Sequence, residues 1–409
     1  MYSRLPVPTA LVEVRPWRQL QRGGTRADRM LDRIEVCIPG RLADLTLPTP
    51  ADLAAMSDQA VRAVTIVDTD HGPYLGALSG LLLRTESVAS SKIEAIEAST
   101  DDYARALHGS RANESATAMV AASAAVGSLM NEVDAHGHVR LIDVLAAHTV
   151  LMRDDPREAR HAGALRTMQN WIGGSDYSPR GADYVPPPPE LVPELIEDLF
   201  NFIARTDIPS GIQAAIAHAQ FELIHPFTDG NGRIGRSLIN AVLRARGVTN
   251  RVVIPAASVL MARRSDYFSA LGAFRGGDAG PIASLMVMAL LVAAEESSIT
   301  AIRLQSVHQE WRSRLATNRA ARSGSAPMLA LDHLLVNPVV NAEGVHAFLG
   351  GSVSRTYATL DRLHAAGIIE PLTDRKRNQV WAARDLLDEL TDLDSRIQSR
   401  ARTLDPPYR

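Results

Sequence analysis

The sequence has a single cysteine, Cys37, and aromatic residues make up only 5% of its 409 positions. One cysteine excludes an intramolecular disulfide framework and any cysteine-rich metal site, and it favours a cytoplasmic location. Long runs of like charge are also missing, and the net charge is only −3. The chain therefore has no general attraction for nucleic acid or for an anionic membrane, and any such binding would need a local basic patch.

No segment predicts a membrane span or a secretory leader. The N-terminal stretch "MYSRLPVPTALVEVRPWRQ" has prolines and arginines where a leader needs an unbroken apolar run. The most apolar stretch, "PIASLMVMALLVAAEES", is shorter than a bilayer span and ends in carboxylates, so it predicts a buried helix. With 46% hydrophobic residues, the chain can bury a large core and form two or three domains.

Apolar spacing predicts a mainly α-helical chain in four parts. Residues 1–115 form an N-terminal helical section, in which the first 25 residues or so look irregular and helices follow in "PADLAAMSDQAVRAVTIV" and "PYLGALSGLLLRTESVAS". Residues 116–300 predict a helical core, and residues 301–325 a charged linker helix. Residues 326–409 predict a separate C-terminal domain after the small residues of "SGSA".

One segment interrupts the helical core, from Asn170 to Glu190. Its two adjacent glycines, its Ser-Pro-Arg-Gly run and its four consecutive prolines are incompatible with a continuous helix. They favour a short hairpin followed by extended chain. On these residues alone, an ordinary surface loop explains the segment equally well.

The C-terminal part predicts a winged helix-turn-helix. Helices in "APMLALDHLLVN", "NAEGVHAFLG" and "SVSRTYATLDRLHAAGII" precede a polar hairpin candidate, "EPLTDRKRNQVWAARD". We expect Ser352 to be the N-cap of the third helix and Gly367 to follow its C-terminus as the C′ residue.

The stretch "HPFTDGNGRIGR", from His225 to Arg236, concentrates the polar chemistry of the chain. An apolar helix arrives at His225, and Pro226 disfavours helix at the residue before it. The glycine-flanked turn then opens a second helix, whose unpaired N–H groups and dipole form an anion cradle. Arg233 and Arg236 lie three residues apart on one helix face, where their guanidinium groups can hold successive phosphates.

This mixture of residues predicts phosphoryl or nucleotidyl transfer. Asp229 supplies one hard oxygen, which suits Mg²⁺ bound mainly by substrate phosphates and water. His225 can take a proton from an attacking hydroxyl, and Asn231 adds a neutral amide donor. Each residue alone is explained as well by a helix cap, a turn or a solvated face. An alternative metal site at His218, Glu222 and His225 lacks the second Glu-x-x-His of di-metal bundles.

The twelve residues resemble the signature of the Fic family, His-Pro-Phe-x-Asp-Gly-Asn-Gly-Arg-x-x-Arg, at every specified position. The segments "FELIHPF", "QNWIGG" and "YVPPPPE" are also similar to bacterial Fic proteins, so the resemblance covers roughly residues 26–300. It implies a mainly α Fic fold with a small β-hairpin flap at residues 170–190. In this family the flap pairs with an extended segment of the target by strand addition.

The resemblance implies a protein adenylyltransferase that moves AMP from ATP to a Ser, Thr or Tyr hydroxyl of a protein. His225 would be the general base, and Asp229 would bind Mg²⁺. The residues implied to bind ATP are Gly230, Asn231, Gly232, Arg233 and Arg236. The intact "GNGR" favours AMP over the phosphate or phosphocholine that some members transfer. The target, which includes the protein itself as a candidate, and a homo-oligomeric state stay open.

The segment "SSKIEAIEA", from Ser90 to Ala98, resembles the inhibitory helix of one large Fic class, Ser/Thr-x-x-x-Glu-Gly/Asn. The resemblance implies that Glu94 pairs with Arg236 and forces the γ-phosphate into an unproductive pose. Ala95 departs from the pattern. Alternatively, Ser91-x-x-Glu94 is a capping box at a helix start.

Two other functions remain open, a DNA-binding regulator whose Fic core senses a nucleotide and a deAMPylase in which Glu94 positions water. For DNA binding, Arg355, Tyr357 and Thr359 would face a groove, and Arg375, Lys376 and Arg377 would form a basic wing. Residues 326–409 hold ten Lys or Arg against eleven Asp or Glu. That balance disfavours strong DNA binding, which depends on neutralising phosphates.

Overall fold

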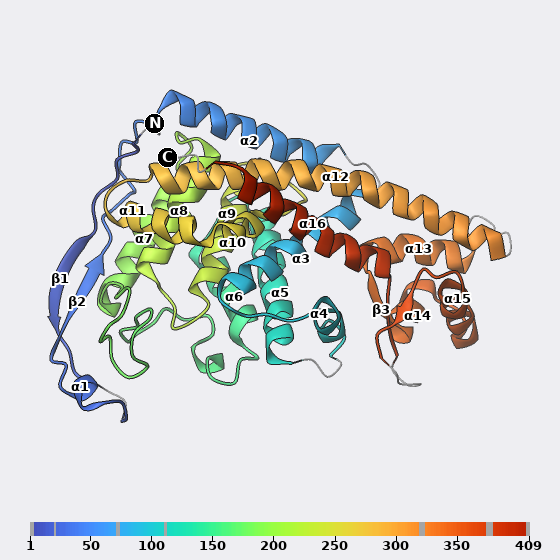
Figure 1. Cartoon of the computed structure of the whole chain (residues 1–409), viewed down its shortest axis with the longest axis horizontal. Coiled ribbons are helices and arrows are strands. Elements are labelled where there is room, and N and C mark those ends of the chain that lie inside the picture. The colour runs from blue at the N-terminus through green and yellow to red at the C-terminus, as the bar shows by residue number, and fades with distance from the viewer. Residues whose placement is uncertain are drawn as a thin grey trace.

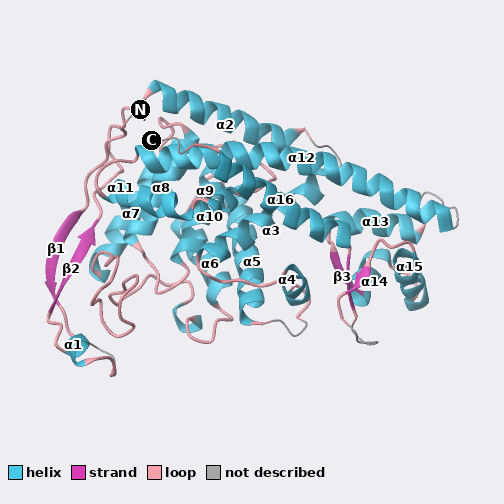
Figure 2. Ribbon diagram, in the orientation of Figure 1, coloured by secondary structure: helices cyan, strands magenta, loops and turns pink. Residues whose placement is uncertain are grey.

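The computed structural model describes residues 4–19, 22–70, 74–109, 113–318, 324–373 and 379–405. Helices make up most of this part of the chain, and two small antiparallel sheets lie at opposite ends of the molecule (Figures 1 and 2). The mainly α fold predicted from the sequence is therefore confirmed.

The N-terminal section contains a β-hairpin, so the prediction of an irregular start followed only by helices is wrong. Strand β1 (Leu11–Pro16) pairs antiparallel with β2 (Arg33–Ile38), and the short helix α1 (Arg26–Arg29) lies between them. The alternation of apolar and polar residues in "LVEVR" and "RIEVCI" is the period-two signal that marks both strands. The Cys37 N–H of β2 donates to Val185 O at 2.8 Å.

Helices α2 (Ala51–Thr69) and α3 (Leu75–Ile93) lie where the apolar spacing predicts them. The helices that follow before the last long one are α4 (Thr100–Ala106), α5 (Glu114–His136), α6 (Leu141–Met152), α7 (Val192–Ile203), α8 (Ser210–Ile224), α9 (Asn231–Ala245), α10 (Ala256–Ala262) and α11 (Arg264–Arg275). Short 3₁₀ turns occur at Ala159–His161 and Pro189–Leu191. Helices α8 and α9 are buried along nearly their whole length and form the centre of the molecule.

Helix α12 (Gly280–Asn318) is a single helix of 39 residues. It is long and apolar enough to cross a membrane by length and composition, but 72% of its apolar window is buried within the molecule. The buried helix predicted from the sequence is thus confirmed. Figure 1 shows α12 running beside α2, and it continues without a break across residue 300, where the sequence suggested a change from core to linker.

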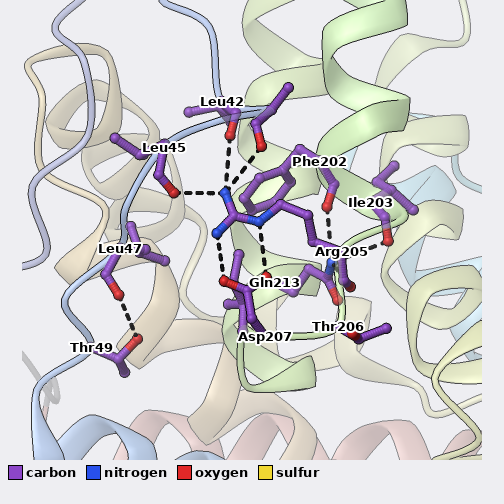
Figure 3. Close-up of polar contacts among 12 residues, drawn as sticks. Leu42, Leu45, Leu47, Thr49, Phe202, Ile203, Arg205, Thr206, Asp207 and Gln213 are labelled. Carbon is purple, nitrogen blue, oxygen red and sulfur yellow. Dashed lines mark hydrogen bonds and ion pairs between the residues drawn. The ribbon is translucent and has the colours of Figure 1, made fainter.

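Arg205 anchors the segment between β2 and α2 to the end of α7 (Figure 3). One guanidinium nitrogen donates to Leu42 O at 3.4 Å, to Ala43 O at 3.2 Å and to Leu45 O at 2.6 Å. Gln213 of α8 donates to three carbonyl groups at the same corner, those of Phe202, Ile203 and Arg205. The bonds of Gln213 satisfy carbonyl groups at the C-terminal end of α7, where a helix leaves such groups without intrahelical partners.

The C-terminal elements are α13 (Ala326–Val336), β3 (Val339–Asn341), α14 (Ala342–Leu349), α15 (Val353–Ala365), β4 (Glu370–Pro371), β5 (Val380–Ala382) and α16 (Arg384–Thr403). Helices α13, α14 and α15 lie where the pattern predicts them, whereas strand β3 and helix α16 were not predicted. The sheet order is β3-β5-β4. Ser352 caps α15 by accepting from the Arg355 N–H, and Gly367 follows the helix with φ +64°, as predicted. Helix α16 then returns along α12, α10 and α3 (Figure 1).

Of the three residues predicted to face a DNA groove, two are exposed and one is buried. Arg355 and Tyr357 are exposed on α15. Thr359 is buried, and its hydroxyl donates to Arg355 O at 2.8 Å, so the prediction for this residue is wrong. The predicted basic wing, Arg375 to Arg377, lies outside the described residues.

Candidate active site

His225 ends α8 in a left-handed conformation, with φ 49° and ψ 60°. The sequence prediction that the helix stops here is confirmed. A left-handed conformation is costly for a residue with a Cβ atom, so surrounding contacts must hold it. Arg166 provides them, because its Nε donates to His225 O at 2.8 Å and its backbone N–H donates to Pro226 O at 2.9 Å.

The segment from Arg166 to Asn170 braces the back of this loop. The Arg166 side chain is buried and also donates to Pro187 O at 2.6 Å, while Asn170 Nδ2 donates to Phe227 O at 2.9 Å. The loop carbonyl groups are therefore directed away from the N–H groups of α9. Sequence reasoning singled out "QNWIGG" only as a resemblance and gave Arg166 no role.

His148 of α6 holds the loop from its other side. Its ring stacks on Phe227, with centroids 3.8 Å apart and planes at 4°. The Gly163 N–H donates to its Nδ1 at 2.9 Å, so the proton is on Nε2, which donates to Asp229 O at 3.1 Å. Burial lowers the pKa of His148 to about 4, so the ring is neutral at neutral pH. A single histidine within an apolar helix gave no signal in the sequence.

Gly230, with φ 76°, turns the chain into α9. Asn231 closes this turn, since its Oδ1 accepts from the Phe227 N–H and its Nδ2 donates to Phe227 O. Its side chain is buried and both amide atoms are used. Asn231 therefore shapes the cradle through these two bonds.

Glu94 lies directly on the cradle. A Cβ atom at Gly232 would overlap the Glu94 carboxylate, so only glycine allows this approach. Glu94 Oε1 accepts from Arg236 Nη2 at 2.7 Å, and Ser90 accepts two more bonds from the same guanidinium group, through its hydroxyl at 2.8 Å and its carbonyl at 2.9 Å. The structure thus brings the predicted Glu94 and Arg236 together, and a carboxylate lies where a helix N-terminus attracts an anion.

The end of α3 explains the sequence around Glu94. Glu94 follows the last helical residue, so the alternative of a capping box at a helix start is wrong. The Ala95 N–H donates to Lys92 O and the Ile96 N–H donates to Ser91 O, which is the bonding of a Schellman motif. Ala95 has φ 59°. That conformation favours Gly or Asn, the residues that the inhibitory pattern has at this position.

Burial and neighbouring charges keep His225 neutral, and Arg236 lies in the same site as a fixed cation. Burial lowers the pKa of His225 to about 4, and Arg166 contributes to the same shift. The His225 Nδ1 atom is buried and has no hydrogen-bond partner in the described part of the chain. Although burial opposes it, Arg236 holds the pKa of Glu94 below its ordinary value. His225 can therefore accept a proton at neutral pH, while the Glu94–Arg236 pair stays ionised.

Asp229 and Arg233 lie at the open side of the cradle. The Asp229 side chain is 56% exposed, and its Oδ1 accepts from the Gly230 N–H at 2.6 Å. Its other oxygen lies 3.8 Å from Arg233 Nη2. One exposed carboxylate fits Mg²⁺ that takes its remaining ligands from phosphates and water. Arg233 is buried, and its Nε has no partner within the described ranges.

The alternative metal site does not form among the described residues. His218 is fully buried and its Nε2 lies 2.8 Å from the Tyr267 hydroxyl, while its Nδ1 is 3.9 Å from Glu222. In the same part of the chain, the group of His, Asp and Glu with metal-like spacing is Glu132, His136 and Asp143. Arg140 already pairs with Glu132 and Asp143 there, so the charges are compensated.

The segment predicted as a hairpin forms a loop closed by one antiparallel bridge. The Ile172 N–H donates to Tyr184 O, and the Asp183 N–H donates to Ile172 O, both at 2.8 Å. The Tyr184 hydroxyl donates to Leu223 O at 2.5 Å, two residues before His225. The loop is therefore fixed to the end of α8 that presents the histidine.

This arrangement of helices and loops is similar to that of known proteins. Residues 139–243, from the start of α6 to the end of α9, match the model of the Fic/DOC family. A crystal structure of a Fic family protein from Desulfovibrio desulfuricans superposes with a TM-score of 0.50 and 23% identity, covering 82% of this chain and 96% of that one. The protein therefore has a mainly helical Fic fold with small sheets, and residues 139–243 are similar to the Fic/DOC family.

Part of the chain is also similar to known enzymes. A probable protein adenylyltransferase of Aquifex aeolicus is 41% identical over 92 residues, which is 22% of this chain and 26% of that protein. The protein adenylyltransferase fic-1 of Caenorhabditis elegans is 33% identical over 150 residues, 36% of this chain and 26% of that protein. The matches span about a quarter of the length of these relatives. Part of this chain is thus similar to part of two protein adenylyltransferases.

Proposed function

We propose that the protein transfers AMP from ATP to a Ser, Thr or Tyr hydroxyl of a protein target. The observation that carries this proposal is the meeting of a neutral, half-buried His225 with the cradle at the start of α9 and the fixed charge of Arg236. The relationship of the Fic/DOC domain to protein adenylyltransferases supports the same reaction.

In this reaction, His225 takes the proton of the target hydroxyl as its oxygen forms a bond to the α-phosphorus of ATP. The bond to the leaving pyrophosphate breaks, and the target gains AMP as a phosphodiester. The N–H groups of α9, Arg233 and Arg236 bind the phosphates and stabilise the developing charge. Asp229 would hold Mg²⁺, which supplies additional positive charge at the phosphates.

We further propose that Glu94 inhibits this transfer. Its carboxylate occupies the cradle and takes a bond of Arg236 that a phosphate would need. A charge-assisted hydrogen bond is worth about 1.5–3 kcal/mol, and each 1.4 kcal/mol changes a population about tenfold. Because the Glu94 side chain is 41% exposed, we expect the lower part of that range.

The testing experiment compares wild type with Glu94→Gly, incubated with α-labelled ATP and Mg²⁺, followed by mass spectrometry for AMP adducts on the protein itself or on an added lysate. We expect incorporation to rise about tenfold in Glu94→Gly. The double variant Glu94→Gly/His225→Ala should show none, because it lacks the base. Absence of any adduct with Glu94→Gly would contradict the proposed reaction, and equal incorporation by wild type would contradict inhibition.

A further inference from the structure

Helix α4 lies between two functional parts of the chain. It begins at Thr100, directly after the segment from Glu94 to Ser99, which we call the inhibitory turn. Its residue Ala104 is fully buried in a cluster made otherwise by the C-terminal unit, meaning the described residues from 326 to 405. The cluster contains Ala104, Val339, Leu372, Val380, Ala382 and Leu387, with Leu107 packed against it. Helix α4 is therefore part of the C-terminal unit's hydrophobic core, although more than 200 residues separate them in the chain.

Polar contacts bind α4 to the same unit. An ion pair joins Arg384 to Asp101 at 2.8 Å, and His108 Nε2 lies 3.0 Å from Val339 O. The Thr100 hydroxyl lies 3.3 Å from that of Thr391 on α16. These contacts begin one residue after the inhibitory turn ends.

The other end of the inhibitory turn is held by α16 as well. Lys92, two residues before Glu94, forms an ion pair with Asp394 at 3.3 Å, and the two side chains are only 29% and 14% exposed. Gln398 supports Asp394 from the next turn of α16, with Nε2 at 2.9 Å. The C-terminal unit thus holds the inhibitory turn on both sides.

The inhibitory turn is strained at one residue. Ala95 adopts φ 59°, a left-handed conformation that is unfavourable for a residue with a Cβ atom. The Glu94 and Ala95 side chains are exposed, whereas Ile96 and Ala98 pack against Val88, Tyr103 and Met119. A cavity of about 940 Å³ opens along the joint between α4 and the C-terminal unit, lined by Arg105 and His108 on one side and His346 and Tyr357 on the other. The joint is therefore not close-packed along this side.

We propose that the C-terminal unit controls the inhibitory turn, because its contacts with Lys92 and α4 hold Glu94 on Arg236. Loosening the unit frees the cradle, and a partner that displaces it acts as an activator. The link to AMP transfer rests on the proposed function, whereas the structural coupling does not. Since partly exposed ion pairs contribute modestly, loss of Lys92–Asp394 should shift the equilibrium of the turn about two- to fivefold.

Hydrogen–deuterium exchange on the full chain tests the coupling without any enzymatic activity. In Asp394→Asn, which keeps the shape and the contact with Gln398, amides from Glu94 to Ser99 should exchange about two- to fivefold faster. The charge-swapped variant Lys92→Asp/Asp394→Lys should restore the wild-type rate. Asp392→Asn, an exposed position on the same helix, is the matched control and should change nothing. Unchanged exchange in Asp394→Asn would overturn the proposal.

AMP incorporation then tests the consequence. Asp394→Asn should raise incorporation about two- to fivefold over wild type, and it should add nothing to Glu94→Gly, since the inhibitor is already absent there. An equal increase in both backgrounds would overturn the proposal, because the ion pair would then act on another step. If exchange changes as expected but Glu94→Gly incorporates no AMP, the coupling stands and the proposed function fails.

Discussion

At the scale of single residues, the site depends on two left-handed conformations without glycine, those of Ala95 and His225. Each lies at the end of a helix, α3 or α8; Ala95 directly follows Glu94, and His225 is itself a residue of the candidate site. Arg166 compensates the strain at His225 through its bond to the His225 carbonyl. At Ala95, the backbone N–H donates to Lys92 O in the Schellman motif, and the strain of the left-handed conformation remains. The position of His225 is therefore braced by a side chain, while Ala95 is held by backbone bonds.

Replacing Ala95 by glycine should strengthen inhibition. The change removes the clash of a Cβ atom in the left-handed region, which outweighs the greater freedom of glycine in the unfolded chain, and the net gain should be about 0.5–1 kcal/mol. We expect a higher midpoint of thermal unfolding and an AMP incorporation about two- to fivefold below that of wild type. The matched control is Ala55→Gly, at an exposed position inside α2, which should lower stability. Destabilisation by both changes would contradict the strain at Ala95.

The low pKa of His225 sets the pH range of the reaction. Because burial lowers this pKa to about 4, the imidazole keeps its neutral, proton-accepting form well below the ordinary pKa of 6.5. In the Glu94→Gly background, AMP incorporation should stay nearly constant from pH 7.5 down to about pH 5.5. Initial rates across this range, with circular dichroism to confirm folding, would check this. A decline with a midpoint near pH 6.5 would contradict the burial of the base.

At the scale of elements, the loop between α6 and α7 is joined by Arg166 to the end of α8 that carries His225. Arg166 bonds at once to His225 O on the catalytic loop and to Pro187 O in the extended chain after the hairpin. A movement of either segment would therefore strain or break the bonds of Arg166 to the other segment. The planar guanidinium fork is required for this, since a lysine has one donor centre and cannot reach carbonyl groups in several directions.

Arg166→Lys should lower AMP incorporation about tenfold or more in the Glu94→Gly background, because the base loses its exact position. Affinity for ATP, measured by titration with a fluorescent nucleotide analogue, should change little, since α9 remains intact. Arg205→Lys is the matched control, because Arg205 also binds several carbonyl groups but lies away from the site. It should reduce stability without changing the rate per folded molecule. Equal rate losses in both variants would contradict the positioning role.

At the scale of the whole molecule, buried ionisable groups make stability depend on pH. Glu86 of α3 is almost fully buried, and its Oε2 accepts from the Ala257 N–H of α10 at 2.8 Å. Burial raises the pKa of Glu86 from 4.5 to about 8. The folded protein thus keeps this group protonated at neutral pH, while the unfolded chain ionises it above about pH 4.5. Stability from this group is complete below pH 4.5 and is lost as the pH rises toward 8.

Glu86→Gln should remove this dependence, because glutamine has the shape of the protonated acid and does not ionise. Wild type and variant should unfold at similar temperatures at pH 4.5. At pH 8 the variant should be more stable by a few kcal/mol, given about 1.4 kcal/mol for each unit of pKa shift. Thermal unfolding at both values measures the difference, and exposed Glu97→Gln is the control. A difference that does not change with pH would contradict the raised pKa.

The sequence by itself determined the features that depend on neighbouring residues. The helices α2, α3, α8 and α9, the end of α8 at His225, and the cap of α15 at Ser352 follow from apolar spacing, proline and capping residues within a few positions. The hairpin β1–β2 was also marked by local alternation, but the prolines and arginines around it obscured the pattern. The residues of the cradle could also be predicted from the sequence, because they lie close together in one loop and at the start of one helix.

Only the tertiary structure decided which distant groups meet there. Glu94 contacts Arg236 from 142 positions away, Arg166 holds His225 from 59 away, and Lys92 pairs with Asp394 across 302. Local patterns say which face of a helix is apolar, but many partners could cover that face with similar gain in free energy. Close packing and the pairing of buried polar groups select one arrangement, and in that arrangement Glu94, Arg166 with His225, and the C-terminal unit lie together.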